Sequence, residues 1–249
     1  MEHKDTNKRD MTEKTHGIVL RRVRYNDTGL IVDIFTASRG TVTFLAKIGK
    51  GGRRKLQALA PLTLAEVSFR WRTQHTLQHL DEVQVARPYS TLSADPMKAS
   101  VALFLQEFLY HTLKHEVANK PLYDYLEQSM EWLDSHGEGL ANFHLTFMLR
   151  LTRHLGLWPR TYGWREGCVF DLKEGVMTDM LPAHRFYTGI TETSYIPHIT
   201  RMTFRSMRLF KMNRTQRNVI LDVLLAYYRL HVPEFPELKS VEMLREVFA

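Results

Sequence analysis

The hydrophobic positions of this chain follow two different periods, and the change between them divides it into two parts. From Gly17 to Val85 apolar and polar residues alternate, as in the stretch from Ala65 to Arg72. Such alternation is typical of half-buried β-strands. Turn residues separate five runs, at 17–25, 30–35, 41–47, 65–72 and 76–85. Five short strands suit a small closed barrel, because closure leaves no unpaired strand edge.

From Pro96 onward the apolar residues recur every three or four positions, which is the spacing of amphipathic α-helices. Asn213 and Gln216 have the spacing of a capping box at a helix start, and Gly156 is placed to end another helix. The segment 158–195 is rich in Gly, Pro and aromatic residues and is expected to be mostly irregular. The expected helices cover 96–112, 121–133, 143–155, 213–228 and 239–248.

These patterns predict an α+β protein in which an N-terminal five-stranded OB-type β-barrel is followed by an all-α domain. A flexible tail is expected over residues 1–15, the barrel over 16–88, and the helical domain over 89–249 with the irregular insertion 158–195. No stretch approaches the ~18 consecutive apolar residues of a membrane span. The charged N-terminus lacks the apolar region of a signal peptide. We therefore expect a cytoplasmic protein that does not enter a membrane.

The positive charge of the chain is concentrated in the barrel. Residues 17–89 contain 12 Lys and Arg against 5 Asp and Glu, whereas residues 1–16 balance at 4 and 4 and residues 90–249 at 18 and 18. The whole net charge of +7 therefore lies on the small β-domain. Concentrated positive charge is typical of proteins that bind polyanions, because each neutralised phosphate releases counterions. The alternative is a solvated basic surface that serves solubility alone.

The densest group of cations follows the third strand, where residues 47–55 combine five cations with three glycines. Glycines let backbone N–H groups approach a phosphate chain, and the cations supply the electrostatic attraction. Trp71 lies at a hairpin end and is expected either to stack on a base or to pack in the core. The residues expected to bind nucleic acid are Arg21, Arg22, Arg24, Lys47, Lys50, Arg53, Arg54, Lys55, Arg70, Trp71 and Arg72.

A second group of cations lies in the helical domain. Arg201, Arg205 and Arg208 are spaced i, i+4, i+7, which would place them on one face of a helix. They form a possible second surface for DNA or a protein partner. The alternative is a solvent-exposed helix face whose charges have no binding role. Acids elsewhere in the domain cancel its net charge.

No arrangement of residues indicates catalysis. The sequence Gly49-Lys50-Gly51-Gly52 lacks the upstream glycine and the following Ser or Thr of a phosphate-binding loop. His111 and His115 share a helix face, but Asn119 stands where a metalloprotease motif has its second histidine, so they make a poor zinc site. Asp33 and Asp81 are carboxylates that have no obvious catalytic partner in the sequence. We expect no catalytic residue, no cofactor and no metal.

An ordered series of short motifs resembles the family of the bacterial recombination mediator RecO, from about residue 15 to the C-terminus. No single motif is diagnostic, and the order of the series carries the resemblance. The N-terminal motifs are Gly17-Ile18-Val19-Leu20-Arg21, Tyr25-Asn26-Asp27, Asp33-Ile34-Phe35-Thr36 with Gly40, and Ala46-Lys47. The C-terminal motifs are Glu107-Phe108-Leu109, Leu122-Tyr123-Asp124-Tyr125-Leu126, Arg153-His154-Leu155-Gly156-Leu157-Trp158-Pro159 and Leu238-Lys239-Ser240.

The resemblance implies a protein without enzymatic turnover. Members of that family bind single- and double-stranded DNA, anneal complementary strands, and act with RecR to help load RecA onto DNA coated by single-stranded-DNA-binding protein (SSB). Their helical domain binds the acidic, hydrophobic C-terminal tail of SSB, which needs an apolar pocket rimmed by cations. Association with the nucleoid follows from these partners. The candidates for the pocket are Lys114, Phe147, Arg150, Leu151 and Arg153.

One departure from the family concerns the insertion. Many members carry a four-cysteine zinc module there, whereas this chain has Cys168 alone, so we expect no metal and a stabilisation by aromatic packing instead. The aromatic residues available for it are Tyr162, Trp164, Phe170, Phe186 and Tyr187. The alternative function is an RNA- or ribosome-associated OB-fold protein, since a basic barrel does not by itself distinguish DNA from RNA. Binding to the SSB tail would separate the two.

Overall fold

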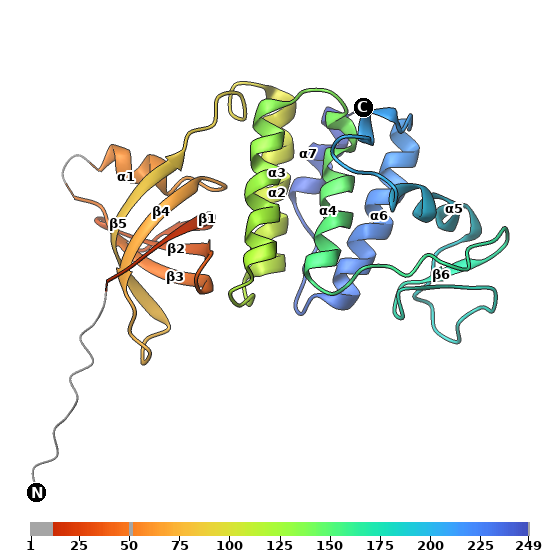
Figure 1. Cartoon of the computed structure of the whole chain (residues 1–249), viewed down its shortest axis with the longest axis horizontal. Coiled ribbons are helices and arrows are strands. Elements are labelled where there is room, and N and C mark those ends of the chain that lie inside the picture. The colour runs from red at the N-terminus through yellow and green to blue at the C-terminus, as the bar shows by residue number, and fades with distance from the viewer. Residues whose placement is uncertain (1–11, 50–51, 249) are drawn as a thin grey trace, which may run out of the picture. The chain divides into compact units, whose positions relative to one another are not determined.

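The computed structural model describes residues 12–49 and 52–248 (Figure 1). The chain forms two compact units. The first comprises the described residues up to Pro88 together with Leu113–Tyr123, and the second comprises Tyr89–Thr112 and the described residues from Asp124 onward. The first break in the chain therefore lies at the change of hydrophobic period. The short segment Leu113–Tyr123, which sequence patterns assign to the helical part, belongs to the barrel unit instead.

Five strands close into a barrel in the order β1-β2-β3-β5-β4, which confirms the expected OB-type fold. All neighbouring pairs are antiparallel except β3 and β5, which run parallel. The first strand begins earlier than expected, because Thr12–Thr15 pair with β4 and are not part of a tail. Residues 1–11 lie outside the described residues. The strands are β1 (Thr12–Arg24), β2 (Gly29–Thr36), β3 (Gly40–Lys47), β4 (Leu64–Arg70) and β5 (Leu77–Arg87).

A buried carboxylate joins three adjacent strands of the barrel. Asp33 on β2 accepts hydrogen bonds from Nε of Arg21 on β1, at 2.8 Å, and from Oγ1 of Thr43 on β3, at 2.7 Å. Because Asp33 is only 6% exposed, both partners are needed to satisfy its charge. Inside the barrel, Phe44 and Phe69 meet edge to face with ring centroids 5.0 Å apart. Polar and aromatic contacts together fix the register of the strands.

The turn into β3 requires a glycine because another segment of the same unit lies against it. Gly40 has φ of +73°, and a Cβ there would lie 2.2 Å from the Glu116 carbonyl oxygen. Gly40 forms an antiparallel bridge with Val117, and the Thr41 N–H donates to Glu116 O at 2.9 Å. Any side chain at Gly40 would therefore separate β3 from the segment Leu113–Tyr123.

The second unit is helical, as expected. The capping box is confirmed: Asn213 Oδ1 accepts from the Gln216 N–H and Gln216 Oε1 accepts from the Asn213 N–H, each at 2.9 Å. Gly156, with φ of +72°, follows the end of α4. The helices of the chain are α1 (Arg53–Ala58), α2 (Pro96–Leu113), α3 (Lys120–Ser135), α4 (Phe143–His154), α5 (Ile190–Ile199), α6 (Arg214–His231) and α7 (Ser240–Val247), with 3-10 turns η1 (Leu140–Asn142) and η2 (Met207–Leu209).

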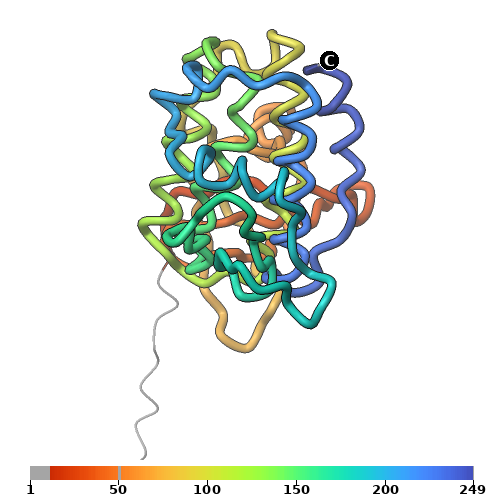
Figure 2. Tube along the Cα trace, turned by 90° about the vertical axis from the view of Figure 1, so that its right-hand side faces the viewer, coloured from red at the N-terminus to blue at the C-terminus, as the bar shows by residue number. Residues whose placement is uncertain are grey.

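Aromatic side chains form the core of this unit. Phe108 on α2 meets Tyr228 on α6 edge to face at 4.8 Å, Phe147 on α4 at 6.4 Å, and Phe235 at 5.9 Å. The largely irregular insertion contains only a short hairpin of β6 (Val169–Asp171) and β7 (Val176–Thr178) before α5 begins. Figure 2 shows this insertion on the side of the chain that faces the viewer. No helix within the described part of the chain is long and apolar enough to span a bilayer.

A carboxylate anchors the segment that enters the helical unit. Asp134, near the end of α3, accepts the backbone N–H groups of Ser90, Thr91 and Leu92 at 2.7 to 3.1 Å. Burial raises the pKa of the Asp134 carboxyl, but these backbone hydrogen bonds outweigh it and lower the pKa to about 2. The buried amine of Lys98 completes the arrangement by donating to the Asp134 carbonyl oxygen at 2.6 Å.

We predict that Asp134→Ala lowers the free energy of unfolding by about 1–3 kcal/mol, because it removes the charged acceptor of three backbone N–H groups, of which those of Thr91 and Leu92 are partly buried. The contribution of Asp134 should be complete above its ordinary pKa of 3.8 and should disappear as the pH falls toward 2. Urea denaturation at pH 7 and at pH 3 measures both effects. Glu127→Ala removes a carboxylate from the same helix and serves as the control. Equal losses for the two variants would contradict the assignment.

Candidate nucleic-acid interface

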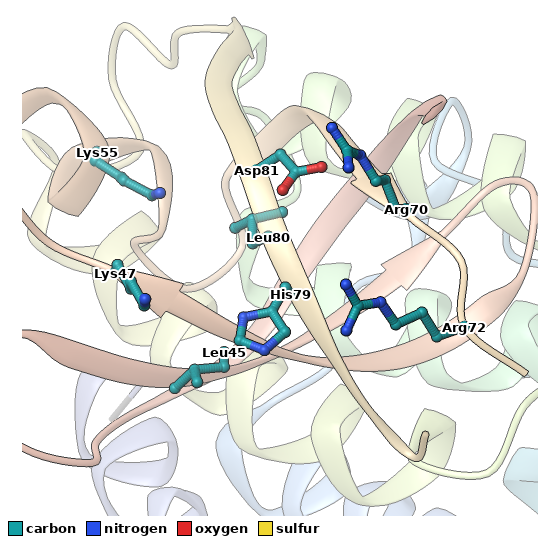
Figure 3. A pocket seen from close by; sticks show the side chains of 8 residues that line it. All are labelled: Leu45, Lys47, Lys55, Arg70, Arg72, His79, Leu80 and Asp81. Atoms are coloured by element: carbon teal, nitrogen blue, oxygen red, sulfur yellow. The ribbon is translucent and has the colours of Figure 1, made fainter. Parts of the chain in front are cut away.

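A basic cleft lies on the barrel where β3 and β5 close it in parallel (Figure 3). In that pairing Leu45 is opposite His79 and Ala46 is opposite Leu80. The cleft has a volume of about 480 Å³, enough for part of a nucleotide chain. Eight residues line it, namely Leu45, Lys47, Lys55, Arg70, Arg72, His79, Leu80 and Asp81.

Four of the cations expected from the sequence meet in this cleft, although they come from four parts of the barrel. Lys47 is the last residue of β3, Lys55 lies on α1, Arg70 is the last residue of β4, and Arg72 lies in the turn before β5. The sequence patterns indicated a loop at Arg53–Ala58, whereas the structure has helix α1 there. It is held by its buried end at Ala58. The cleft therefore combines strand ends and a short helix into one positively charged surface.

The same cleft contains two polar residues that sequence reasoning did not place in it. His79 and Asp81 alternate along β5 with Leu80, which is 5% exposed. Burial lowers the pKa of the Lys55 amine, while the nearby charge of Asp81 acts in the opposite direction. Asp81 is thus the single carboxylate among the residues that line the cleft. It partly neutralises the cations in the absence of a ligand.

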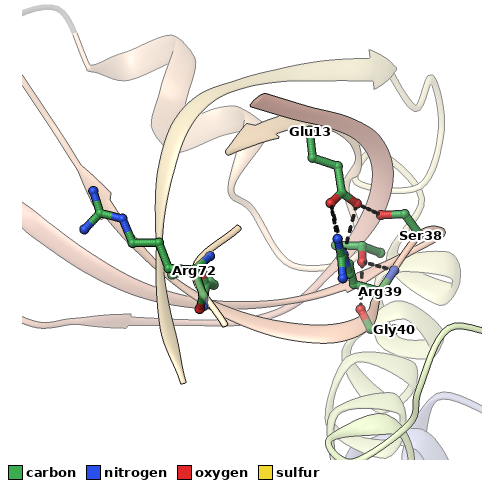
Figure 4. Close-up of polar contacts among 7 residues, drawn as sticks. Glu13, Ser38, Arg39, Gly40 and Arg72 are labelled. Carbon is green, nitrogen blue, oxygen red and sulfur yellow. Dashed lines mark hydrogen bonds and ion pairs between the residues drawn. The ribbon is translucent and has the colours of Figure 1, made fainter. Parts of the chain in front are cut away.

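Trp71 is shared between the barrel core and the surface. Its ring meets Phe69 edge to face at 6.3 Å, and the guanidinium carbon of Arg39 lies 4.5 Å from the ring centroid. Arg39 is held in turn by Glu13, whose carboxylate accepts from Nη2 of Arg39 at 2.8 Å and from Oγ of Ser38 (Figure 4). Burial raises the pKa of Glu13, but these partners outweigh it and lower the pKa. A base that stacks on that face of Trp71 must displace Arg39.

The remaining barrel residues expected to bind nucleic acid do not line the cleft. Arg21 is engaged with Asp33, Arg22 donates to the Leu56 carbonyl oxygen at 2.7 Å, and Arg24 pairs with Asp27 at 3.2 Å. Arg21 and Arg22 thus tie β1 to other elements of the barrel unit, whereas the Arg24–Asp27 pair is local and exposed. Arg53 and Arg54 are exposed on α1, and Lys50 lies outside the described residues.

The five candidate residues for a partner pocket differ in burial and do not all belong to the helical unit. Phe147 and Leu151 are fully buried. Arg150 donates to the carbonyl oxygen of Met202 from Nε and Nη2, at 2.8 and 2.6 Å, and burial lowers its pKa. The guanidinium of Arg153 lies 3.9 Å from the ring centroid of Trp158 and remains exposed. Lys114 belongs to the barrel unit.

The expectation that Arg201, Arg205 and Arg208 share a helix face is wrong. Helix α5 ends at Ile199, and only the 3-10 turn η2 follows before α6. The three arginines are exposed on an irregular stretch. Their spacing matches a helix, but the backbone carbonyls of this stretch are bound by side chains from elsewhere in the unit, as Arg150 binds Met202.

The aromatic packing expected in the insertion is only partly present. Phe170 is buried and lies 6.0 Å from the ring of Tyr227, whereas Tyr162 is 77% and Trp164 42% exposed. Phe186 and Tyr187 are also exposed. Hydrogen bonds supply further support, since the N–H of Phe170 donates to hydroxyl oxygens of Thr188 and Thr193. Among residues 12–49 and 52–248, no three His, Cys, Asp or Glu side chains are grouped to hold a metal ion.

Comparison with known proteins assigns the chain to a family. The family described as "Recombination protein O N terminal" matches residues 11–89, and "Recombination protein O C terminal" matches residues 93–163. A DNA repair protein RecO of Phocaeicola vulgatus is 41% identical over 96% of this chain and all of its own length. The chain belongs to the RecO family. A relative of the same name from Bacteroides fragilis is 38% identical over the same shares, and one from Porphyromonas gingivalis is 33% identical over 94% of this chain and 98% of its own.

Membership of the RecO family gives the chain a role in DNA repair and recombination. The N-terminal match covers the whole barrel with its basic cleft, and the C-terminal match ends within the insertion, at residue 163. All motifs of the resemblance except Leu238-Lys239-Ser240 lie within the two matched ranges.

Proposed function

We propose that this RecO-family chain is a non-catalytic recombination mediator whose barrel binds DNA through the basic cleft. It binds single- and double-stranded DNA, anneals complementary strands, and acts with RecR and the C-terminal tail of SSB to help load RecA. Because its proposed substrate is chromosomal DNA, we expect the protein in the cytoplasm, at the nucleoid. Family membership supports the role in repair, and the cleft supplies the surface.

The observation that carries this proposal is the convergence of Lys47, Lys55, Arg70 and Arg72 on one cleft. Four cations from separate elements gain nothing for folding by lying together, because like charges repel. Their closeness becomes favourable when a phosphate chain binds across them and releases its counterions. The apolar side chains of Leu45 and Leu80 offer a surface for the sugar or base between phosphates.

Annealing follows from the same chemistry without nucleotide hydrolysis. Two complementary strands repel each other through their phosphates, and a protein that neutralises both lowers that barrier. The partners RecR, SSB and RecA come to this proposal from the family alone. A protein that bound RNA in preference to DNA, and that ignored the SSB tail peptide, would be an RNA-associated barrel instead.

We predict that removing the exposed cleft cations weakens DNA binding and its dependence on salt. In the cleft variant, Lys47, Arg70 and Arg72 are all replaced by Gln. Its logarithm of affinity for a labelled single strand should fall less steeply with the logarithm of salt concentration, by up to about 2 in slope, since each lost phosphate contact contributes roughly 0.7. Fluorescence anisotropy across a salt series measures this.

The control variant removes the same charge from exposed positions of the helical unit, with Lys173, Arg185 and Arg229 all replaced by Gln. It should bind the labelled strand like the wild type. If the cleft variant and the control variant had the same affinity and the same slope, the basic cleft would be a solvated surface and the proposal would fail.

We also predict that Asp81→Asn strengthens binding, because it removes the carboxylate that faces the cations of the cleft. Two charges about 4 Å apart in water interact by about 1 kcal/mol, so the affinity at low salt should rise about fivefold. Glu82→Gln, at the neighbouring position outside the cleft lining, should change it less. Weaker binding by Asp81→Asn would mean that Asp81 organises the cleft rather than competing with phosphate. The same anisotropy measurement decides between them.

A further inference from the structure

The stretch between α5 and α6 concentrates positive charge and contains no acidic residue of its own. Between Glu192 and Asp222 the sequence contains six Lys and Arg and no Asp or Glu. We call residues 200–214 the cationic segment; it is the blue stretch that leads from α5 to α6 in Figure 1. Five of its side chains are exposed cations, namely Arg201, Arg205, Arg208, Lys211 and Arg214.

Side chains from other elements hold the backbone of the cationic segment. Arg150 on α4 donates to the carbonyl oxygens of Thr200 and Met202. Asn142 Nδ2 donates to the carbonyl oxygens of Met207 and Phe210, both at 2.9 Å. These bonds satisfy carbonyl groups that a helix would otherwise bond internally. The segment is therefore fixed in place although the turn η2 is the only regular element between α5 and α6.

Aromatic packing fixes the segment a second time. The ring of Phe204 stacks against Phe143 at 5.1 Å, Trp132 at 5.5 Å and Tyr125 at 6.2 Å, with interplanar angles of 14° to 21°. Met202 is fully buried as well. The apolar side chains of the segment thus point into the unit, which leaves the cations at the surface between them.

The backbone of the segment also approaches a glycine closely. Gly139 has φ of +77°, and a Cβ there would lie 3.0 to 3.2 Å from the backbone and Cβ of Arg208. The side chain of Arg208 makes an ion pair with Glu138 at 3.5 Å, and the Glu138 side chain is itself 81% exposed. This close, glycine-dependent contact fixes the backbone of the segment at Arg208.

From these observations we propose that the cationic segment is a binding site for a second nucleic-acid strand. This inference rests on the proposed function and adds a site to it. Guanidinium groups and an amine spaced along an irregular backbone suit successive phosphates. An acidic peptide partner would in addition need an apolar groove, whereas Met202, Phe204 and Met207 of the segment are turned inward and only Leu209 among its apolar residues is largely exposed.

Two polyanion sites on one chain account for annealing without any nucleotide. One strand occupies the basic cleft of the barrel and its complement occupies the cationic segment, so each chain neutralises both strands. Raising the local concentration of one strand near the other then favours pairing. A single site would hold strands only one at a time.

The test compares the cleft variant with a segment variant in which Arg201, Arg205 and Lys211 are all replaced by Gln. Arg208 is left in place because of its ion pair with Glu138. The wild type should bind two dT15 oligonucleotides per chain, and each variant should bind one, in a titration at protein concentrations well above the dissociation constant. Counting per chain makes the result independent of the oligomeric state. Annealing of complementary 30-mers near 0.1 M salt should slow about tenfold in both variants.

The control variant should bind two oligonucleotides and anneal at the wild-type rate, and circular dichroism should confirm that all variants are folded. A segment variant that still bound two oligonucleotides and annealed normally would overturn the inference, while the cleft variant tests the proposed function separately. A segment variant with unchanged stoichiometry that lost binding to a labelled peptide of alternating Asp and Phe would assign the segment to an acidic protein partner. That result would also overturn the inference.

Discussion

The parallel pairing of β3 with β5 is the constraint on which the candidate interface depends. Parallel strands cannot be joined by a tight hairpin, so the chain must leave the end of β3, cross over, and return in the same direction. Here the crossover consists of α1 and β4, and it brings Lys55 and Arg70 back to the seam where Lys47 ended β3. The cleft is therefore a consequence of how the barrel closes. Its cations are separated in sequence because the crossover separates them.

Contacts between distant motifs explain why the family resemblance is an ordered series rather than one signature. The Glu107 carboxylate accepts the N–H groups of Lys239 and Ser240, at 3.0 and 2.8 Å, and so caps the first turn of α7. Burial raises the pKa of Glu107, but the hydrogen bonds from Ser240 and Lys239 outweigh it and keep the pKa below its ordinary value. Gly40 and the segment around Val117 depend on each other in the same way. These motifs are therefore required by contacts with segments distant in the chain.

The sequence predicted those parts of the fold that local chemistry decides. Alternation marked the five strands, and the capping box at Asn213 marked the start of α6. It did not predict α1, whose six residues are too few to show a helical period. It also placed Arg205 on a helix, because spacing alone does not reveal that Asn142 and Arg150 bind the carbonyls nearby. In the cleft, the sequence supplied the cations, but the placement of His79 arises from a long-range pairing without a local signal.

Net charge proved a poor guide to where the helical unit is positive. Its acids balance its cations in number, yet several acids are engaged with other groups: Glu107 caps α7, Asp134 binds the linker from the barrel, and Asp222 pairs with Arg245. At physiological salt, charges more than about 8 Å apart are largely screened from each other. A phosphate near Arg201 or Lys211 therefore responds mainly to the charges within that distance and not to the sum over the unit. An electrically neutral domain can carry a polyanion site whenever its acids are committed to internal hydrogen bonds elsewhere.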